Sequence, residues 1–354
     1  MALTDKIKEK IAIEVIRTLV TRFDNFPEDA SNNRNAPFHE AFLSAFSDKL
    51  EENVSNIPFF ISLSSWMHGL NTTLGQTFFE NVAHHVSQGE KREYTSKRLG
   101  NLPITQTQRD RISQIIADLS TSTKVPDLDS ENQLLFANYD TVIIDAMDFS
   151  ADVYIEDTSS ITAIELKSVK PNSGEMKGEK QKILEGKAAL FRKFPGKHIR
   201  FYMGFPFDPT VDVGHELVTS FDKTRFLGQI INMNKYFAPN ETLIASELWD
   251  TLSGDTNTME KILEIINAIS TTEFLSKYCL LIENSNRNNQ TYKDILAEWH
   301  LISELELIEN DELLKQNIGI DRKLNRYYNK TAFDSSGNYN MDRYIELKKH
   351  ITTR

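Results

Sequence analysis

The sequence contains a single cysteine, Cys279, among its 354 residues. This scarcity excludes an internal disulfide framework and a zinc cluster built from cysteines, and it is typical of a reducing compartment. No apolar run approaches the roughly 20 residues that a membrane-spanning helix needs, and Met1–Lys10 is too polar for a signal peptide. We therefore expect a cytoplasmic protein without a membrane partner.

Several catalytic signatures are also missing. The chain has no glycine-rich phosphate loop of the Walker type, no Gly-x-Ser-x-Gly elbow and no His-Glu-x-x-His pattern. An ATP motor and a serine hydrolase are therefore not indicated. With 40% hydrophobic residues, the chain is nevertheless able to bury one large core or two modest ones.

Positive charge is scarce overall, since the formal net charge is −11. A nucleic-acid partner needs Lys and Arg for phosphate contacts, so this total argues against one. The distribution argues otherwise, because residues 165–200 hold ten Lys or Arg against four Glu. An acidic protein with such a basic stretch is compatible with a DNA enzyme, although lysines that merely solvate a helix are the commoner case.

The stretch Ala151–Ser168 (ADVYIEDTSSITAIELKS) predicts a β-hairpin. If it folds about the midpoint of its polar turn, the numbers of facing residues sum to 317. Asp152 then faces Glu165, and Lys167 lies on the same face because side chains alternate along a strand. The opposite face receives only apolar residues, namely Val153, Ile155, Ile164 and Leu166.

Two facing carboxylates repel each other unless a cation lies between them, and Mg²⁺ prefers carboxylate oxygens and water. A neighbouring lysine can orient a water or stabilise charge that develops on a phosphate. The set therefore predicts metal-assisted hydrolysis of a phosphodiester. A solvated hairpin face with a Glu–Lys pair is the plainer interpretation, and the hairpin alone does not exclude it.

The Glu-x-Lys triplet is weak evidence by itself, because the chain contains four of them. Only Glu165-Leu166-Lys167 ends a predicted strand that faces another Asp-bearing strand. The other three lie in a loop or in helical patterns, where residues two apart do not face each other. The context therefore selects this triplet.

The surrounding periodicities predict an α/β (α+β) arrangement, with helices packed on a mixed sheet. We expect three successive regions: an N-terminal helical region (1–69), a catalytic core (70–210) and a mainly helical C-terminal region (211–354) for dimerisation or DNA recognition. Within the core, the patterns predict a helix over Glu179–Phe194 and a strand over His198–Phe205. We expect His84 and His85 to be structural or to support the site.

This order of elements resembles the PD-(D/E)XK nuclease core over roughly Leu70–Phe207. The whole chain is most similar to the TdeIII/MjaII-like group of Type II restriction endonucleases. The resemblance implies a Mg²⁺-dependent homodimer that cuts double-stranded DNA at a short palindrome, with GGNCC as the suggested type. It also implies a cognate DNA methyltransferase encoded nearby, as a functional rather than a physical partner.

By motif position, the resemblance implies that Asp152 and Glu165 bind metal and that Lys167 positions the attacking water. Glu80 matches a helix-borne acid that many members contribute as a further metal ligand. Ala151 departs from the family's proline, which leaves Asp145 and Asp148 as other candidates for the first acid. Five lysines are expected to hold the DNA backbone: Lys170, Lys177, Lys180, Lys182 and Lys187.

Two other functions stay open at this point. A repair or structure-selective nuclease has the same core but cuts branched or damaged DNA. A non-catalytic DNA-binding protein that retains the fold binds DNA with salt dependence but hydrolyses none.

Overall fold

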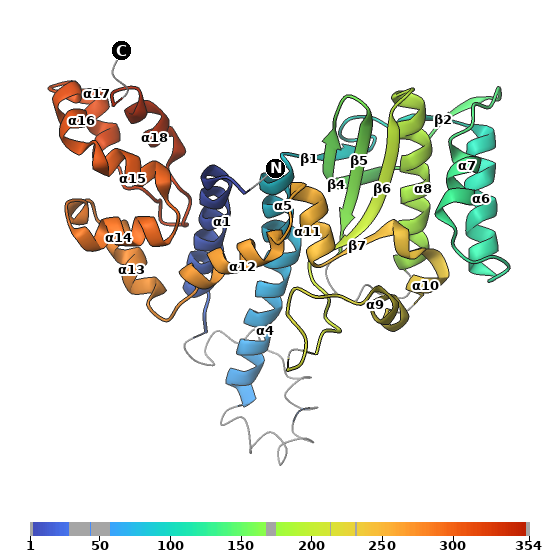
Figure 1. Cartoon of the computed structure of the whole chain (residues 1–354), viewed down its shortest axis with the longest axis horizontal. Coiled ribbons are helices and arrows are strands. Elements are labelled where there is room, and N and C mark those ends of the chain that lie inside the picture. The colour runs from blue at the N-terminus through green and yellow to red at the C-terminus, as the bar shows by residue number, and fades with distance from the viewer. Residues whose placement is uncertain are drawn as a thin grey trace. The chain divides into compact units, whose positions relative to one another are not determined.

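The structure, a computed structural model, describes residues 3–27, 43, 57–167, 175–212, 214–230 and 232–351. The chain forms two compact units (Figure 1). The sheet unit contains Met1–Leu3 and Phe79–Leu263, and the helical unit contains Thr4–Phe78 and Glu264–Arg354. Within the described ranges, no helix combines the length and the apolar character that crossing a membrane requires.

This division differs from the predicted regions 1–69, 70–210 and 211–354. In the helical unit, α1 (Asp5–Asp24) packs against α4 (Ile57–Thr73) and α15 (Ile302–Glu309). The Glu9 carboxylate of α1 accepts hydrogen bonds from the Ser303 backbone N–H and hydroxyl, at 2.7 and 2.6 Å. The N-terminal helix therefore buries its apolar stripe against a C-terminal helix instead of forming a region of its own.

The rest of the helical unit is a set of short helices. Leu307, Leu314, Ile318, Leu324, Leu347 and Ile351 form one of its buried clusters. Its further elements are η2 (Leu74–Phe78), α13 (Phe274–Leu281), η4 (Asn284–Asn286), α14 (Gln290–Glu298), α16 (Asp311–Ile318), α17 (Arg322–Tyr328) and α18 (Met341–Lys348). Helix α12 (Thr258–Ile269) begins in the sheet unit and ends in the helical unit.

A five-stranded mixed sheet forms the centre of the sheet unit. Its order is β1 (Glu90–Tyr94), β4 (Phe149–Glu156), β5 (Ser160–Leu166), β6 (His198–Phe205) and β7 (Thr242–Ile244). The first three strands are antiparallel neighbours, whereas β5, β6 and β7 run parallel. Strands β2 (Pro103–Thr105) and β3 (Ile143–Asp145) form a separate pair. The α/β (α+β) prediction is confirmed.

Helices cover both faces of this sheet. Helix α8 (Glu175–Lys193) packs so closely that a Cβ on Gly186 would lie 2.6 Å from Phe201 Cε1. On the other face, a Cβ on Gly204 of β6 would lie 3.1 Å from Leu248 Cδ1 of α11 (Ser246–Ser253), and α5 (Phe79–Ser87) packs beside α11 (Figure 1). The remaining elements are α6 (Gln106–Ser120), α7 (Leu128–Leu135), α9 (Lys223–Gln229), α10 (Met233–Tyr236) and η3 (Pro239–Glu241).

The hairpin register is the predicted one. Val153 pairs with Ile164, and Glu156 with Ile161, so facing numbers sum to 317. The plainer interpretation, in which the charged face is solvated, is wrong, however. Helix α8 covers the charged face too, and Glu165 is only 8% exposed. The carboxyl therefore titrates in a desolvated environment, which changes its chemistry.

Strand β4 contains a β-bulge where it pairs with β1. Tyr154 pairs with Glu90 and Ala151 with Arg92. Asp152 and Val153 consequently lie opposite one residue, Lys91. Bulges bend a strand and redirect its side chains, and they are common next to active sites.

Candidate active site

The β4–β5 hairpin brings the three predicted catalytic residues together. The Leu166 backbone N–H donates to Asp152 Oδ2 at 2.9 Å, and Lys167 Nζ donates to Glu165 Oε1 at 3.1 Å. The backbone N–H of Lys167 also donates to the Gly204 carbonyl of β6 at 2.9 Å. Backbone pairing thus fixes where each of these side chains leaves the sheet.

Burial and charge shift the protonation equilibria of this group. Burial, and then the charge of Asp152, raise the pKa of Glu165 to about 7, although Lys167 opposes the shift. Burial lowers the pKa of Lys167, but the charges of Glu165 and Glu179 outweigh it, so the net shift is upward. Lys167 is therefore an ammonium at neutral pH, suited to orienting a water or stabilising negative charge rather than to taking a proton.

Glu179 of α8 is a further member of the group that the sequence analysis missed. Its Oε1 lies 3.2 Å from Lys167 Nζ and 3.1 Å from Lys182 Nζ. Its Oε2 is buried without a hydrogen-bond partner. In the sequence, Glu179 looks like an ordinary acid at the start of a helix. It contacts Lys167 because α8 packs back on the sheet.

Glu80 of α5 reaches Asp152 through a lysine. Lys91 Nζ lies 3.2 and 3.0 Å from the two Glu80 oxygens and 3.1 Å from Asp152 Oδ1. Burial lowers the pKa of Lys91, but the hydrogen bond to Glu80 and the charge of Asp152 produce a net rise. Lys91 was also missed, because the charged sequence EKREY does not look like a strand, although it forms β1.

His84 of α5 supports the same strand. Its Nε2 lies 2.6 Å from the Asp152 carbonyl oxygen, so that nitrogen carries the proton it donates. The contact agrees with the expected supporting role of His84. Of the other candidates for the first acid, Asp148 accepts a hydrogen bond from Asn101 at 2.7 Å, and Asp145 is exposed on β3 of the separate pair.

The side chains suit a hard divalent cation. Asp152 lies near enough to Glu165 to raise its pKa, and one oxygen of Glu179 lacks a partner. Such excess negative charge favours a cation held by carboxylates. Among the described residues, however, no three His, Cys, Asp or Glu side chains converge into one group. Glu80 reaches Asp152 through the Lys91 ammonium, which contacts both carboxylates.

The five predicted DNA-backbone lysines have different environments. Lys177 is exposed, and the side chain of Lys182 is 45% exposed. Lys180 and Lys187 are buried, at 0% and 1% exposure, and pair with carboxylates inside the sheet unit. Because neither amine reaches the surface, the prediction that they contact DNA is wrong. Lys170 lies outside the described residues.

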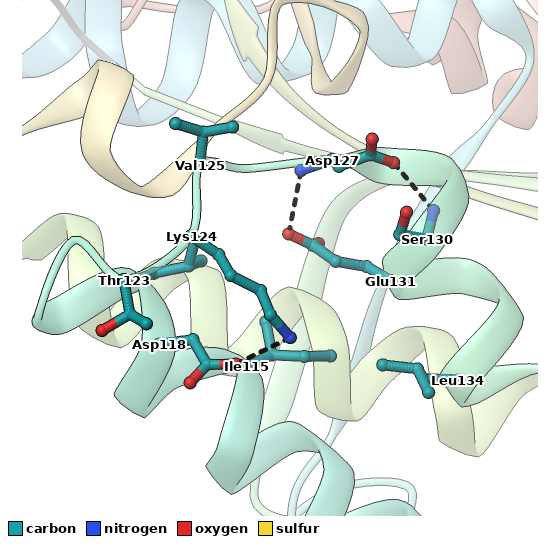
Figure 2. A pocket seen from close by; sticks show the side chains of 10 residues that line it. Ile115, Asp118, Thr123, Lys124, Val125, Asp127, Ser130, Glu131 and Leu134 are labelled. Carbon is teal, nitrogen blue, oxygen red and sulfur yellow. Dashed lines mark hydrogen bonds and ion pairs between the residues drawn. The ribbon is translucent and has the colours of Figure 1, made fainter.

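A pocket of about 470 Å³ lies between α6 and α7 (Figure 2). Apolar side chains such as Ile115 and Leu134 line it, together with Asp118, Asp127 and Glu131. Figure 2 shows Glu131 Oε accepting from the Asp127 backbone N–H, at 3.4 Å. The pocket contains none of the predicted catalytic residues, so the hairpin remains the candidate site.

Comparisons with known proteins agree with this geometry. The family described as "Type II restriction endonuclease, HinfI" matches residues 3–270. The curated "Type II restriction enzyme MjaII" of Methanocaldococcus jannaschii is 41% identical over 367 aligned residues, which cover 98% of this chain and 97% of that protein. No solved structure matches the chain.

Proposed function

Since the chain belongs to the HinfI family of Type II restriction endonucleases and is a site-specific deoxyribonuclease, we propose that Asp152, Glu165 and Lys167 form its Mg²⁺-dependent catalytic site. Enzymes of this family generally use divalent metal ions. Family membership favours restriction over the repair nuclease and over the non-catalytic protein.

Asp152 and Glu165 would hold the metal, with Glu80 as a further ligand. When bound, Mg²⁺ polarises the scissile phosphate and neutralises charge in the transition state. The chain's own residues do the positioning. Glu165 and Glu179 hold the Lys167 ammonium within 3.1 and 3.2 Å, where it orients the attacking water. The Leu166 N–H holds Asp152, and His84 holds the Asp152 backbone.

One observation carries this proposal: on the hairpin, Asp152 accepts the Leu166 backbone N–H at 2.9 Å, and the flanking Glu165 and Lys167 contact each other at 3.1 Å. Exposed Lys177 and Lys182, with Lys170 from the sequence, would contact the DNA backbone. The proposal also includes a homodimer, a cytoplasmic location, a short palindromic target of the GGNCC type, and a cognate methyltransferase encoded nearby.

The test is cleavage of plasmid DNA in Mg²⁺ and in EDTA by the wild-type chain, Lys167→Ala and Lys124→Ala. Lys124 is the matched control. It also forms an ion pair, with Asp118 at 3.0 Å, and it does not belong to the hairpin. We expect discrete fragments from the wild type and from Lys124→Ala in Mg²⁺ only. Sequencing of the fragment ends identifies the target. Discrete fragments from Lys167→Ala at the wild-type rate would overturn the assigned role.

A further inference from the structure

Lys91 lies between two carboxylates that the proposed mechanism offers to a metal ion. Its ammonium contacts both oxygens of Glu80 and Oδ1 of Asp152, all within 3.2 Å. The remaining oxygen, Asp152 Oδ2, accepts the Leu166 N–H at 2.9 Å. In this state, all four carboxylate oxygens of the pair already have a donor.

The backbone builds this arrangement. The bulge in β4 leaves Lys91 as the one residue of β1 opposite Asp152 and Val153. Glu80 comes from α5, which packs on β4. The side chains of Glu80 and Asp152 are 18% and 16% exposed, while that of Lys91 is 38% exposed. The Lys91 ammonium is therefore more accessible to water than the two carboxylates are.

We propose that Lys91 is a built-in counter-ion, which holds Glu80 and Asp152 together in the metal-free enzyme and competes with a divalent cation for them. This inference rests on the proposed function, because it takes Asp152 as a metal ligand. The ammonium swings toward solvent when the cation binds, and it returns when the cation leaves.

If Lys91 competes with the cation, removal of its ammonium should lower the stability of the metal-free protein and raise its affinity for the cation. Without the ammonium, two carboxylates repel each other, so the metal-free protein is less stable. A divalent cation, by contrast, binds more tightly, because no positive charge has to leave its ligands. A lysine with a merely structural role would give the first effect without the second.

The experiment compares wild type, Lys91→Met, Lys91→Arg and Lys124→Met as full chains without DNA. Thermal unfolding in EDTA measures the stability of the metal-free state. Titration with Mn²⁺ alone, followed by the electron paramagnetic resonance signal of the free ion, measures affinity. We expect Lys91→Met to melt at lower temperature and to bind Mn²⁺ about tenfold more tightly, as removal of a unit charge a few ångströms away predicts. Lys91→Arg and Lys124→Met should bind Mn²⁺ as the wild type does.

A measurement on the wild type covers the case in which Lys91→Met does not fold. Acetic anhydride labelling, read by peptide mass spectrometry, should modify Lys91 faster when Mg²⁺ is added, while labelling of Lys124 stays constant. Unchanged labelling of Lys91, or an unchanged or weaker Mn²⁺ affinity in Lys91→Met, would overturn the inference.

Asp152→Asn separates failure of this inference from failure of the proposed function. If Asp152→Asn weakens Mn²⁺ binding but Lys91→Met does not strengthen it, the metal site stands and the competition is refuted. If Asp152→Asn leaves Mn²⁺ binding unchanged, Asp152 is not a ligand, and the proposed site fails together with the inference.

Discussion

Two neighbouring residues of α8, Glu179 and Lys180, belong to charge clusters of opposite character. Glu179 joins Glu165 and Lys167 in the candidate site, where Glu179 Oε2 has no hydrogen-bond partner. Lys180 is fully buried, 2.6 Å from Glu131 and 2.7 Å from Glu241. Lys187 completes this second cluster at 3.4 Å from Glu241.

The difference lies in charge balance and access. The buried cluster has two lysines and two glutamates, so its charges match, and each residue is at most 5% exposed. The candidate site combines Glu165, whose pKa is raised by burial and by the charge of Asp152, with side chains that reach solvent, such as Lys167 at 22%. A balanced, closed cluster stabilises the fold, whereas an acid-rich, accessible one is suited to a cation and a substrate.

The largest expected effect is on the candidate site. Glu165→Gln should reduce DNA cleavage about 1,000-fold or more, because a neutral amide holds a divalent cation poorly and metal catalysis supplies several kcal/mol. Its melting temperature in EDTA should not fall, since the variant removes a buried acid that repels Asp152. Single-turnover cleavage measures the expected loss of activity, and thermal unfolding measures the melting temperature. A large loss of stability would place Glu165 with the structural cluster instead.

Lys180→Met should act in the opposite way, on stability. It leaves Glu131 and Glu241 buried with only Lys187 nearby, and breaking a buried ion pair costs about 3–5 kcal/mol of unfolding free energy. Urea unfolding measures the loss. Lys182→Met is the control on the same helix, and because the Lys182 side chain is 45% exposed, we expect a change within about 1 kcal/mol. Equal values for the two variants would remove the distinction between the clusters.

The close contact between α8 and the sheet predicts a smaller effect. Gly186→Ala should cost about 1–3 kcal/mol, because its Cβ would meet the Phe201 ring at 2.6 Å. Gly178→Ala, on the same helix with no atom within 4 Å of the added Cβ, should instead gain up to about 1 kcal/mol from helix propensity. Urea unfolding of the pair tests this. A change of the same sign in the unfolding free energy of both variants would mean that α8 is not closely packed on the sheet at Gly186.

The last expected effect is a pH dependence. The pKa of Glu165 is raised to about 7 in the folded protein. Its contribution to stability is therefore fully present below about pH 4.5 and is lost as the pH rises through about 7. In EDTA, the wild type should lose more unfolding free energy than Glu165→Gln between about pH 5 and pH 8. Urea unfolding across that range checks this. If the unfolding free energies of the two proteins changed in parallel with pH, the raised pKa of Glu165 would be contradicted.

Local patterns predicted much of the sheet unit. Alternation along the hairpin gave the register of β4 and β5, and the aromatic run His198–Phe205 matches β6 residue for residue. Helix α8 begins at Glu175, four residues before the predicted start, and apolar periodicity located its body. These features depend on neighbours in sequence, which is why periodicity finds them.

The missed features depend on distant partners. Strand β1 has the sequence EKREY, whose charges do not look like a strand, and it forms because β4 offers it an edge. Residues 242–244 likewise become β7 through pairing with β6. The burial of Lys180 and Lys187 likewise follows from Glu131 and Glu241, which are 49 or more positions away along the chain.

The β-bulge makes the candidate site sensitive to the length of the chain as well as to its chemistry. One residue fewer between Ala151 and Tyr154 would restore even pairing with β1 and remove the bulge, so that Lys91 would face one residue of β4 instead of two. Loss of Val153 would thus keep Asp152 opposite Lys91 but change the direction of its side chain. We therefore expect the site to tolerate no insertion or deletion of a single residue in this strand, whereas it tolerates substitutions of side chains that do not contact the charged residues.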